Sequence, residues 1–210
     1  MTNANHEKAF QPAPITLTGQ HARLEPLELR HAADLFQAGN EPEMWAYMPI
    51  PMPSSVGAVE EMIRTAHAQA ASAGPVPAAI PFAIIDVASG RAVGSTRYLD
   101  IQPAHRGLEI GWTWVGPEFR RTAVNTECKL LLLEHAFEAH GAIRVQLKTD
   151  SRNVRSQTAI ARLGAQREGV LRNHMIVQGG HFRDSVYFSI TADEWPGVKQ
   201  GLLEKLGREG

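Results

Sequence analysis

Two hydrophobic periods alternate along this chain. Over residues 143–149, Ile143, Val145 and Leu147 are separated by polar side chains, which is the two-residue period of a half-buried β-strand. Over residues 29–38 the apolar side chains recur at three- and four-residue intervals, as in an amphipathic helix. Because segments of both kinds follow one another, the sequence predicts an α/β protein with a mixed sheet.

The same patterns predict the remaining elements. Strands are predicted over 22–27, 82–87, 93–100, 108–115, 143–149, 165–177 and 182–190. Helices are predicted over 29–38, 56–71, 123–139 and 153–163, with another beginning near Ala192. Two turn signals, at 88–91 and 178–181, join neighbouring strands as hairpins. Residues 40–53 are too rich in proline to form a regular element.

Composition limits the class of protein. With 210 residues, 43% of them hydrophobic, and a net charge of −1, the chain can form one large domain with a sizeable core. Its lysines and arginines form no basic stripe, which disfavours a nucleic-acid partner. The single cysteine, Cys128, excludes an internal disulfide and favours a reducing compartment, and the histidines show no metal-ligand spacing. We therefore expect a cytoplasmic protein without a metal, a signal peptide or a membrane-spanning segment.

The domain boundary is predicted near residue 15. Residues 1–14 lack hydrophobic periodicity and are expected to form a disordered or loosely attached tail. No linker or internal repeat divides the rest, so residues 15–210 are expected to form a single domain.

The stretch EFRRTAVNTE, at 118–127, joins a predicted strand to a predicted helix. Unpaired N–H groups at a helix N-terminus favour anions, and Arg120 and Arg121 add positive charge. Phosphate-binding loops usually contain glycines that let the backbone approach the phosphate, and this stretch has none. The residues alone leave two interpretations open, an unusual anion site and a surface turn.

Several strings in this order resemble the GNAT superfamily of N-acetyltransferases, and within it the RimJ/RimL-like branch. The strings are ARLEPLELRHAADLF (22–36), WAYMPIP (45–51), LEIGWTWVGPEFRR (108–121), NVRSQTAIARLGA (153–165), REGVLR (167–172) and YFSITADEW (187–195). The resemblance implies a GNAT-like mixed, mostly antiparallel sheet flanked by helices. It also implies acetyl transfer from acetyl-CoA to a primary amine, either a protein N-terminus or a small molecule. Dimers are common in that branch, so it suggests a homodimer.

The resemblance places the pyrophosphate of coenzyme A on the loop from Arg120 to Asn125. Ala123 and Asn125 stand where the family pattern has small residues, mainly glycine. If position 123 is helical, the alanine methyl costs little; if it needs a positive φ, the alanine costs about 1 kcal/mol or more. The cofactor-binding residues that the resemblance implies are Thr113, Val115, Arg120, Arg121, Thr122, Ala123, Val124, Asn125, Thr126, Asn153 and Ser156.

The resemblance also assigns catalytic roles. Glu109, eleven residues before Arg120, is the expected general base, although a strand glutamate is more often solvated or paired with a cation. The N–H of Thr113 is expected to stabilise charge on the thioester oxygen, in a strand whose alternation a bulge near 112–114 would break. Many relatives place a tyrosine acid where this chain has Ile160, and the branch offers Ser156 instead. Ser156 is otherwise a first-turn residue behind an Asn153 cap.

The acceptor side is the least defined by sequence. Trp45 and Tyr47 are expected to line the amine pocket together with Glu109, from their place in the proline-rich segment. His174, Arg183 and Asp184 meet either a polar substrate or solvent. A catalytically silent acyl-CoA-binding module is the alternative function. A P-loop nucleotide enzyme is excluded, because the chain contains no G-x-x-x-x-G-K-[ST] motif.

Overall fold

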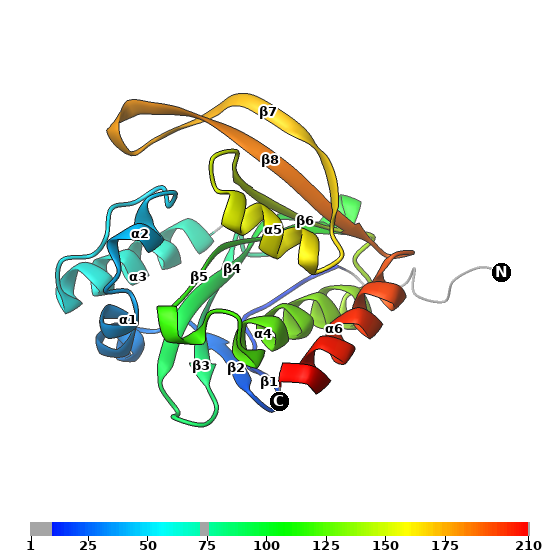
Figure 1. Ribbon diagram of the computed structural model, residues 1–210, viewed down its shortest axis with the longest axis horizontal. Helices are drawn as coiled ribbons and strands as arrows, with labels where there is room; N and C mark the ends of the chain where they lie inside the picture. The colour runs from blue at the N-terminus through cyan, green and yellow to red at the C-terminus, as the bar shows by residue number, and fades with distance from the viewer. Residues whose placement is uncertain (1–9, 72–75, 210) are drawn as a thin grey trace.

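The computed structural model describes residues 10–71 and 76–209 and has one eight-stranded sheet (Figure 1). The strand order is β1-β2-β3-β4-β5-β6-β8-β7, and β5 with β6 is the parallel pair among otherwise antiparallel neighbours. The predicted mixed, mostly antiparallel sheet is therefore confirmed. The strands are β1 (Leu17–Thr18), β2 (Ala22–Pro26), β3 (Ile80–Asp86), β4 (Ala92–Gln102), β5 (Gly107–Val115), β6 (Arg144–Asp150), β7 (Gln166–Val177) and β8 (His181–Thr191).

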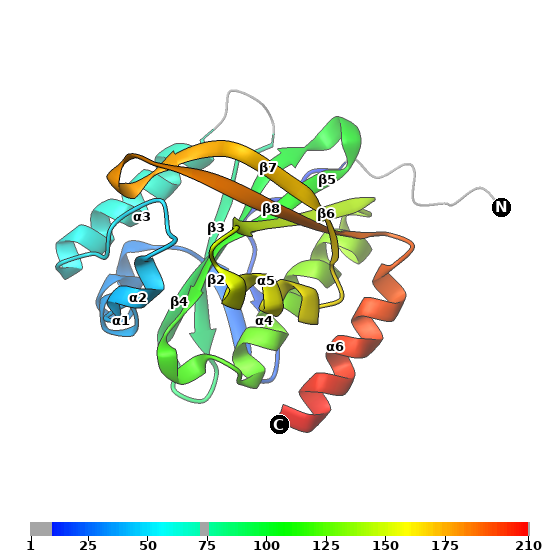
Figure 2. The ribbon, with the colours of Figure 1, turned by 45° about the horizontal axis from the view of Figure 1, so that its top comes forward.

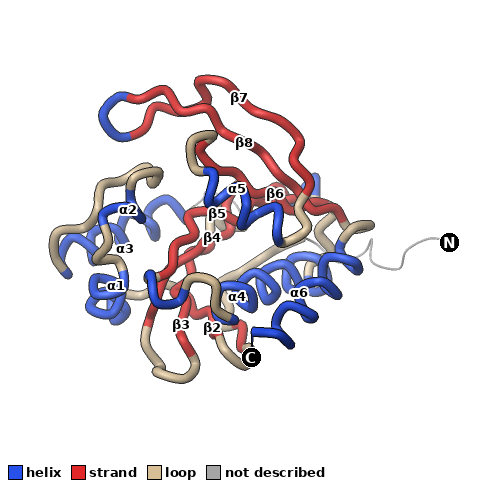
Figure 3. Tube along the Cα trace, in the orientation of Figure 1, coloured by secondary structure: helices blue, strands red, loops and turns tan. Residues whose placement is uncertain are grey.

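The helices lie on both sides of the sheet (Figure 3). They are α1 (Ala32–Ala38), α2 (Pro42–Trp45), α3 (Val56–Ala70), α4 (Ala123–Glu134), α5 (Val154–Arg162) and α6 (Trp195–Glu209). A π-helical turn over His135–Ala139 extends α4 to the end of the predicted helix. The short α2 forms in the segment predicted to be irregular, because Pro42 begins it at a position where no backbone N–H is needed. None of the described helices is both long and apolar enough to cross a membrane.

Two hydrophobic cores lie on opposite faces of the sheet. Ile84 of β3 packs with buried residues of α4 and α6, whereas its neighbour Ile85 packs with buried residues of α1 and α3. This division follows from the strand geometry, since successive side chains point to opposite faces. Both faces of β3 are covered, which is why its sequence is continuously apolar.

A bulge in β5 inverts this alternation. Ser95 pairs with Trp114 and Arg97 pairs with Gly111, so two residues of β5 lie opposite one of β4. Trp112 within the bulge has a φ of 51°. The alternation of β5 therefore breaks beyond Ile110, and Trp114 packs in the core on the α1–α3 side. The bulge implied by the family resemblance is present.

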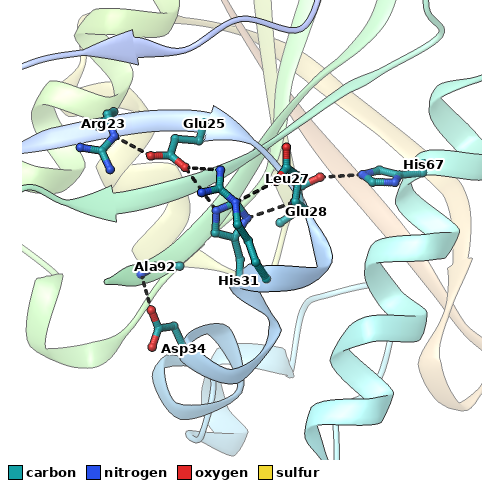
Figure 4. A network of polar contacts seen from close by, with 9 residues as sticks. Arg23, Glu25, Leu27, Glu28, His31, Asp34, His67 and Ala92 are labelled. Atoms are coloured by element: carbon teal, nitrogen blue, oxygen red, sulfur yellow. Dashed lines mark hydrogen bonds and ion pairs between the residues drawn. The ribbon is translucent and has the colours of Figure 1, made fainter. Parts of the chain in front are cut away.

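Polar contacts attach the α1–α3 layer to the sheet (Figure 4). The carboxylate of Glu25 accepts a hydrogen bond from Arg23 Nε at 2.6 Å and lies 3.3 Å from His31 Nε2. Asp34 of α1 accepts from the backbone N–H of Ala92 at 3.1 Å. These contacts hold α1 in place, and the segment that follows α1 borders the opening described below.

The N-terminal segment joins the packed structure earlier than expected. Phe10 is buried in the core on the α4 side, and its ring meets that of His140 edge-on at 6.2 Å. Residue 10 of the predicted tail is therefore anchored in the core and residues 11–14 follow it, while residues 1–9 lie outside the described residues.

Candidate active site

Strands β5 and β6 diverge partway along their length. They pair in register only from Gly107 with Arg144 to Glu109 with Gln146. Beyond that point β5 continues beside β4, and β6 continues beside β8. The edge of β5 after Glu109 thus faces an opening instead of a partner strand, and its backbone groups on that edge can pair with a bound molecule.

Glu109 lies at the fork where the two strands separate. It is only 2% exposed, and its Oε2 lies 2.9 Å from Lys148 Nζ and accepts from Gln146 Nε2 at 3.3 Å. A Cβ at Gly111 would come within 2.7 Å of Glu109 Oε1, so the glycine leaves the space that this oxygen occupies. The side chain is a buried, paired carboxylate, not a glutamate that faces solvent.

A polar face extends from Glu109 across β6 and β8. Lys148 pairs across the strands with Tyr187, and Asp150 pairs with Ser185, which puts each pair on one face of the sheet. His174 Nδ1 lies 3.0 Å from Ser185 Oγ, beside an irregularity in β7 between Leu171 and Met175. Burial lowers the pKa of His174, and the nearby Lys148 and Arg183 lower it further.

The tip of the β7–β8 hairpin reaches the segment after α2. Gln178 Nε2 lies within hydrogen-bond distance of three backbone carbonyls, those of Trp45 at 3.2 Å, Met48 at 2.7 Å and Ile50 at 2.6 Å. The hairpin therefore arches from the sheet to α2, as both ribbon views show (Figure 2). This contact places the proline-rich segment and the polar face of β6 and β8 on the same side of the fork.

The two aromatic residues proposed for the amine pocket have different surroundings. Tyr47 is half-buried, and the guanidinium of Arg152, two residues after the end of β6, lies 5.5 Å from its ring centre. Trp45 is 3% exposed, packs against Trp114 at 5.3 Å, and donates to the carbonyl of Gly39 at 2.8 Å. We therefore keep Tyr47 in the candidate site and leave Trp45 out of it.

The 118–127 loop ends at the N-terminus of α4. Ala123 is the first helical residue, so the helical alternative holds and the methyl is accommodated. The positive φ, 60°, falls on Arg121 instead. Asn125 lies in the first turn, half-buried, and its amide has no hydrogen-bond partner in the described part of the chain. Glu41 accepts a hydrogen bond from Arg120 Nη2, so that guanidinium is already engaged.

The other loop residues offer mainly backbone groups. Thr122 Oγ1 donates to the carbonyl of Phe119 at 2.9 Å, and Val124 and Thr126 are buried. The first turn of α4 nevertheless has no side-chain cap, because the Thr122 hydroxyl is directed elsewhere. Its N–H groups can therefore bind an anion.

Thr113 lies in the bulge and Val115 follows it, both on the α4 side of β5. Thr113 Oγ1 lies 2.8 Å from Thr96 Oγ1 and accepts a hydrogen bond from Lys129 Nζ at 2.6 Å. Lys129 is 7% exposed, and burial lowers its pKa. Val115 pairs with Gly94 of β4 and packs in the core. The side chains of both residues are therefore engaged, so the strand offers its backbone to the opening.

Asn153 is the N-cap of α5. Its side-chain oxygen accepts from the backbone N–H of Ser156 at 3.0 Å, as the capping interpretation predicts. Ser156 is half-buried, and its hydroxyl has no partner among the described residues. Ile160 is buried in the core and carries no acidic group, so the tyrosine acid of other members has no counterpart at this position.

The donor groups on the α4–α5 side fit the parts of acetyl-CoA. The first turn of α4 and Arg121 suit a diphosphate, the unpaired edge of β5 suits the amides of the pantetheine arm, and the Ser156 hydroxyl suits the sulfur. Lys148, Tyr187 and Lys129 carry no local sequence motif. Contacts between strands, or between a helix and a strand, bring these three residues to the site. In the sequence, only the alternation of β6 indicated which face Lys148 would occupy.

The chain belongs to the family described as the acetyltransferase (GNAT) domain, whose model matches residues 21–166. A GCN5-related N-acetyltransferase from Brucella melitensis has a similar solved structure, with a TM-score of 0.85 and 30% identity. That match covers 93% of this chain and 87% of the other. The RimJ protein of Mycobacterium smegmatis, solved with CoA-disulfide, shares the fold with a TM-score of 0.74 and 23% identity, over 91% of this chain and 94% of RimJ.

Among curated proteins, YdaF of Bacillus subtilis is 31% identical over 110 residues, or 52% of this chain, and its name assigns it provisionally to the ribosomal N-acetyltransferases. The match covers 59% of YdaF, and a match to the uncharacterised N-acetyltransferase YoaA of the same organism covers 53% of that protein. The chain thus spans little more than half the length of these relatives. The predicted resemblance to the GNAT superfamily is confirmed by the family model, and the RimJ structure shares its fold.

Proposed function

We propose that this protein transfers an acetyl group from acetyl-CoA to a primary amine. The observation that carries the proposal is the buried Glu109 at the fork of β5 and β6. A helix N-terminus and an unpaired strand edge lie on one side of the fork, and a polar face lies on the other. When bound, acetyl-CoA supplies a thioester whose acetyl carbon forms an amide bond to the amine nitrogen as the C–S bond breaks.

We assign the cofactor to the α4–α5 side. The backbone N–H groups of 122–125, with Arg121 and the amide of Asn125, hold the diphosphate. Arg120 takes part only if its ion pair with Glu41 opens. The edge of β5 at Thr113 and Val115 aligns the pantetheine arm, and the N–H of Thr113 donates to the oxygen on which charge develops. Asn153 fixes the start of α5, where Ser156 donates a proton to the sulfur as it leaves.

We assign the amine to the opposite side of the fork, with Glu109 as the general base. An amine reacts only in its neutral form, and at pH 7 a protein α-amine with a pKa near 8 loses its proton at lower cost than a lysine with a pKa near 10.4. Lys148 offsets the charge of the buried carboxylate, and Tyr47 borders the space that the amine occupies.

The relatives support a protein N-terminus or a small amine as the acceptor, and an amine panel distinguishes them. The panel contains N-terminal peptides, free amino acids and small amines, incubated with acetyl-CoA and followed by thiol release and mass spectrometry. We expect at least one acceptor to be acetylated with one thiol released per amide formed. If acetyl-CoA binds and no acceptor is acetylated, the silent acyl-CoA-binding module is the correct alternative.

We also propose that the protein is a cytoplasmic homodimer joined through the β7–β8 hairpin. Ile176 and Phe182, paired across this hairpin, are 72% and 61% exposed. Apolar side chains gathered on one exposed ribbon are typical of a contact surface. A monomer mass in light scattering at micromolar concentrations would contradict the dimer.

A further inference from the structure

Arg183 is a largely buried cation for which the described residues offer no partner. It is 7% exposed, and its Nε is buried without a hydrogen-bond partner in the described part of the chain. Within the described residues its guanidinium makes no hydrogen bond or ion pair within contact distance, and burial lowers its pKa. A buried charge without a partner is costly, and a chain that retains one at a binding site gains from pairing it with a ligand.

The position of Arg183 places it on the acceptor side of the fork. It lies two residues before Ser185 in β8, so by strand alternation it shares the face that carries Ser185 and Tyr187. Its charge interacts with those of Asp150 and Glu109, which lie on the same face. Arg183 therefore lies among the residues that surround the proposed amine site.

The two nearby carboxylates are already engaged. Glu109 pairs with Lys148 at 2.9 Å, and Asp150 pairs with Arg152 through both carboxylate oxygens, at 2.7 and 2.9 Å. Among the described residues of this face, the guanidinium of Arg183 therefore remains as an unpaired positive charge. The carboxylate of the neighbouring Asp184 does not pair with Arg183, because it accepts a hydrogen bond from the backbone N–H of Asn173 at 2.7 Å.

We propose that Arg183 binds a carboxylate of the acceptor, so that the acceptor is an amine with a carboxylate close to it. This inference rests on the proposed acetyl transfer and specifies its substrate class. The planar guanidinium fork matches a carboxylate through two parallel hydrogen bonds. One surplus positive charge balances a singly charged carboxylate, whereas a phosphate dianion would leave an excess negative charge beside Glu109. A free α-amino acid and a peptide with an acidic residue beside its N-terminus both carry this chemistry.

Matched acceptor pairs test the proposal on the wild-type protein. One arm compares free amino acids with their α-carboxamides, and the other compares peptides that begin Ser-Asp or Ser-Glu with those that begin Ser-Asn or Ser-Gln. We expect the acidic member of a pair to be preferred by about tenfold to hundredfold in kcat/KM, the range of a charge-assisted bidentate contact. The arm that shows the preference identifies the source of the carboxylate.

Variants then assign the preference to this side chain. Arg183→Met should reduce the preference to within about twofold, and Arg183→Lys should retain part of it, because the charge remains without the fork. Arg167→Met is the matched control, since Arg167 is an exposed arginine of the same hairpin, and should keep the full preference. Circular dichroism and acetyl-CoA binding check that each variant is folded.

The outcomes separate this inference from the proposed function. Equal rates for both members of every pair, or a preference that Arg183→Met leaves intact, would overturn the carboxylate site while acetylation itself stands. If no acceptor is acetylated, calorimetry of the same pairs with the coenzyme A-loaded protein decides. Tighter binding of the acidic member would support the carboxylate site at Arg183 but not the proposed acetyl transfer. Equal binding of both members, or no binding, would overturn the carboxylate site and the acetyl transfer together.

Discussion

Lys148 and Gln146 hold the side chain of Glu109 in place, so a substitution can remove its charge while keeping its shape. In Glu109→Gln the amide keeps the volume of the side chain and removes the base. We expect kcat to fall by about 10²–10⁴-fold, the usual contribution of a general base, with the acetyl-CoA dissociation constant within about twofold of wild type. Steady-state thiol release and calorimetry measure the two quantities. As a control, Glu168→Gln removes a partly exposed carboxylate of β7 and should leave kcat and the dissociation constant unchanged. An unchanged kcat in Glu109→Gln would show that Glu109 is not the base.

Ala123 tests whether the glycine-free loop is strained. Because Ala123 begins α4, Ala123→Gly should change acetyl-CoA affinity by less than about twofold. It should also lower the free energy of unfolding by up to about 1 kcal/mol, through the lower helix propensity of glycine. Calorimetry and urea unfolding give these values. A large gain in affinity would show that the methyl obstructs the diphosphate.

For single residues, the sequence predicted the element on which a motif residue lies better than it predicted the side chains that surround that residue. The spacing from Arg120 placed Glu109 on the correct strand, and Asn153 is the predicted cap. Neither the partner of Glu109 nor the lack of a partner at Arg183 was predictable, because Lys148 and Arg183 belong to strands that meet only in the folded sheet. Trp45 was assigned to the pocket from its place in the chain, and tertiary packing put it in the core.

At the scale of elements, one side chain of α4 anchors the start of the sheet. Glu127 is buried, and its carboxylate accepts hydrogen bonds from the backbone N–H groups of Gln20, His21 and Ala22 at 2.9, 2.6 and 2.6 Å. A Cβ at Gly19 would come within 2.4 Å of the same carboxylate, so glycine is needed at that position. The contact joins the β1–β2 turn to the helix that we assign to the diphosphate.

Glu127→Gln should lower the free energy of unfolding by about 2 kcal/mol, because an amide has one acceptor oxygen and brings an unpaired donor into the site. Urea denaturation measures the change. Glu118→Gln, at an exposed position of the preceding loop, should change it by less than about 0.5 kcal/mol. Equal stability of Glu127→Gln and wild type would show that the three hydrogen bonds do not anchor the turn.

Helices and strands with a regular hydrophobic period were predicted within a few residues of their bounds. Features that depend on pairing with another strand, such as β1 and the bulge in β5, were not predicted from the period. The strand over 143–149 is predictable because its alternation reflects one buried face. The two-residue β1 has too short a pattern and exists because β2 pairs with it. The bulge in β5 breaks a period that looks continuous in sequence, so only the family resemblance predicted it.

At the scale of the molecule, acid should destabilise the fold through a buried histidine. Burial, with a smaller effect of His140, lowers the pKa of His135 from 6.5 to about 4. Between these values the unfolded chain binds a proton that the folded chain excludes, so stability is fully present above pH 6.5 and falls as the pH drops toward 4. The loss is at most about 3.5 kcal/mol at ~1.4 kcal/mol per pKa unit.

Urea unfolding between pH 7 and pH 4 tests this dependence. Compared with wild type, His135→Gln should lose less stability over this range, and His105→Gln, at an exposed position, should lose the same amount as wild type. If wild type and His135→Gln have parallel pH profiles, His135 is not the group that excludes the proton.

The proposed cofactor side and the proposed acceptor side lie on opposite flanks of one fork, with Glu109 between them. The crystal structure of the complex with acetyl-CoA tests this arrangement most directly. We expect the diphosphate at the N-terminus of α4, the pantetheine arm along the edge of β5, and the thioester oxygen within hydrogen-bond distance of the N–H of Thr113. Density for the acetyl group away from the opening between β5 and β6, or for the diphosphate away from residues 120–126, would contradict it.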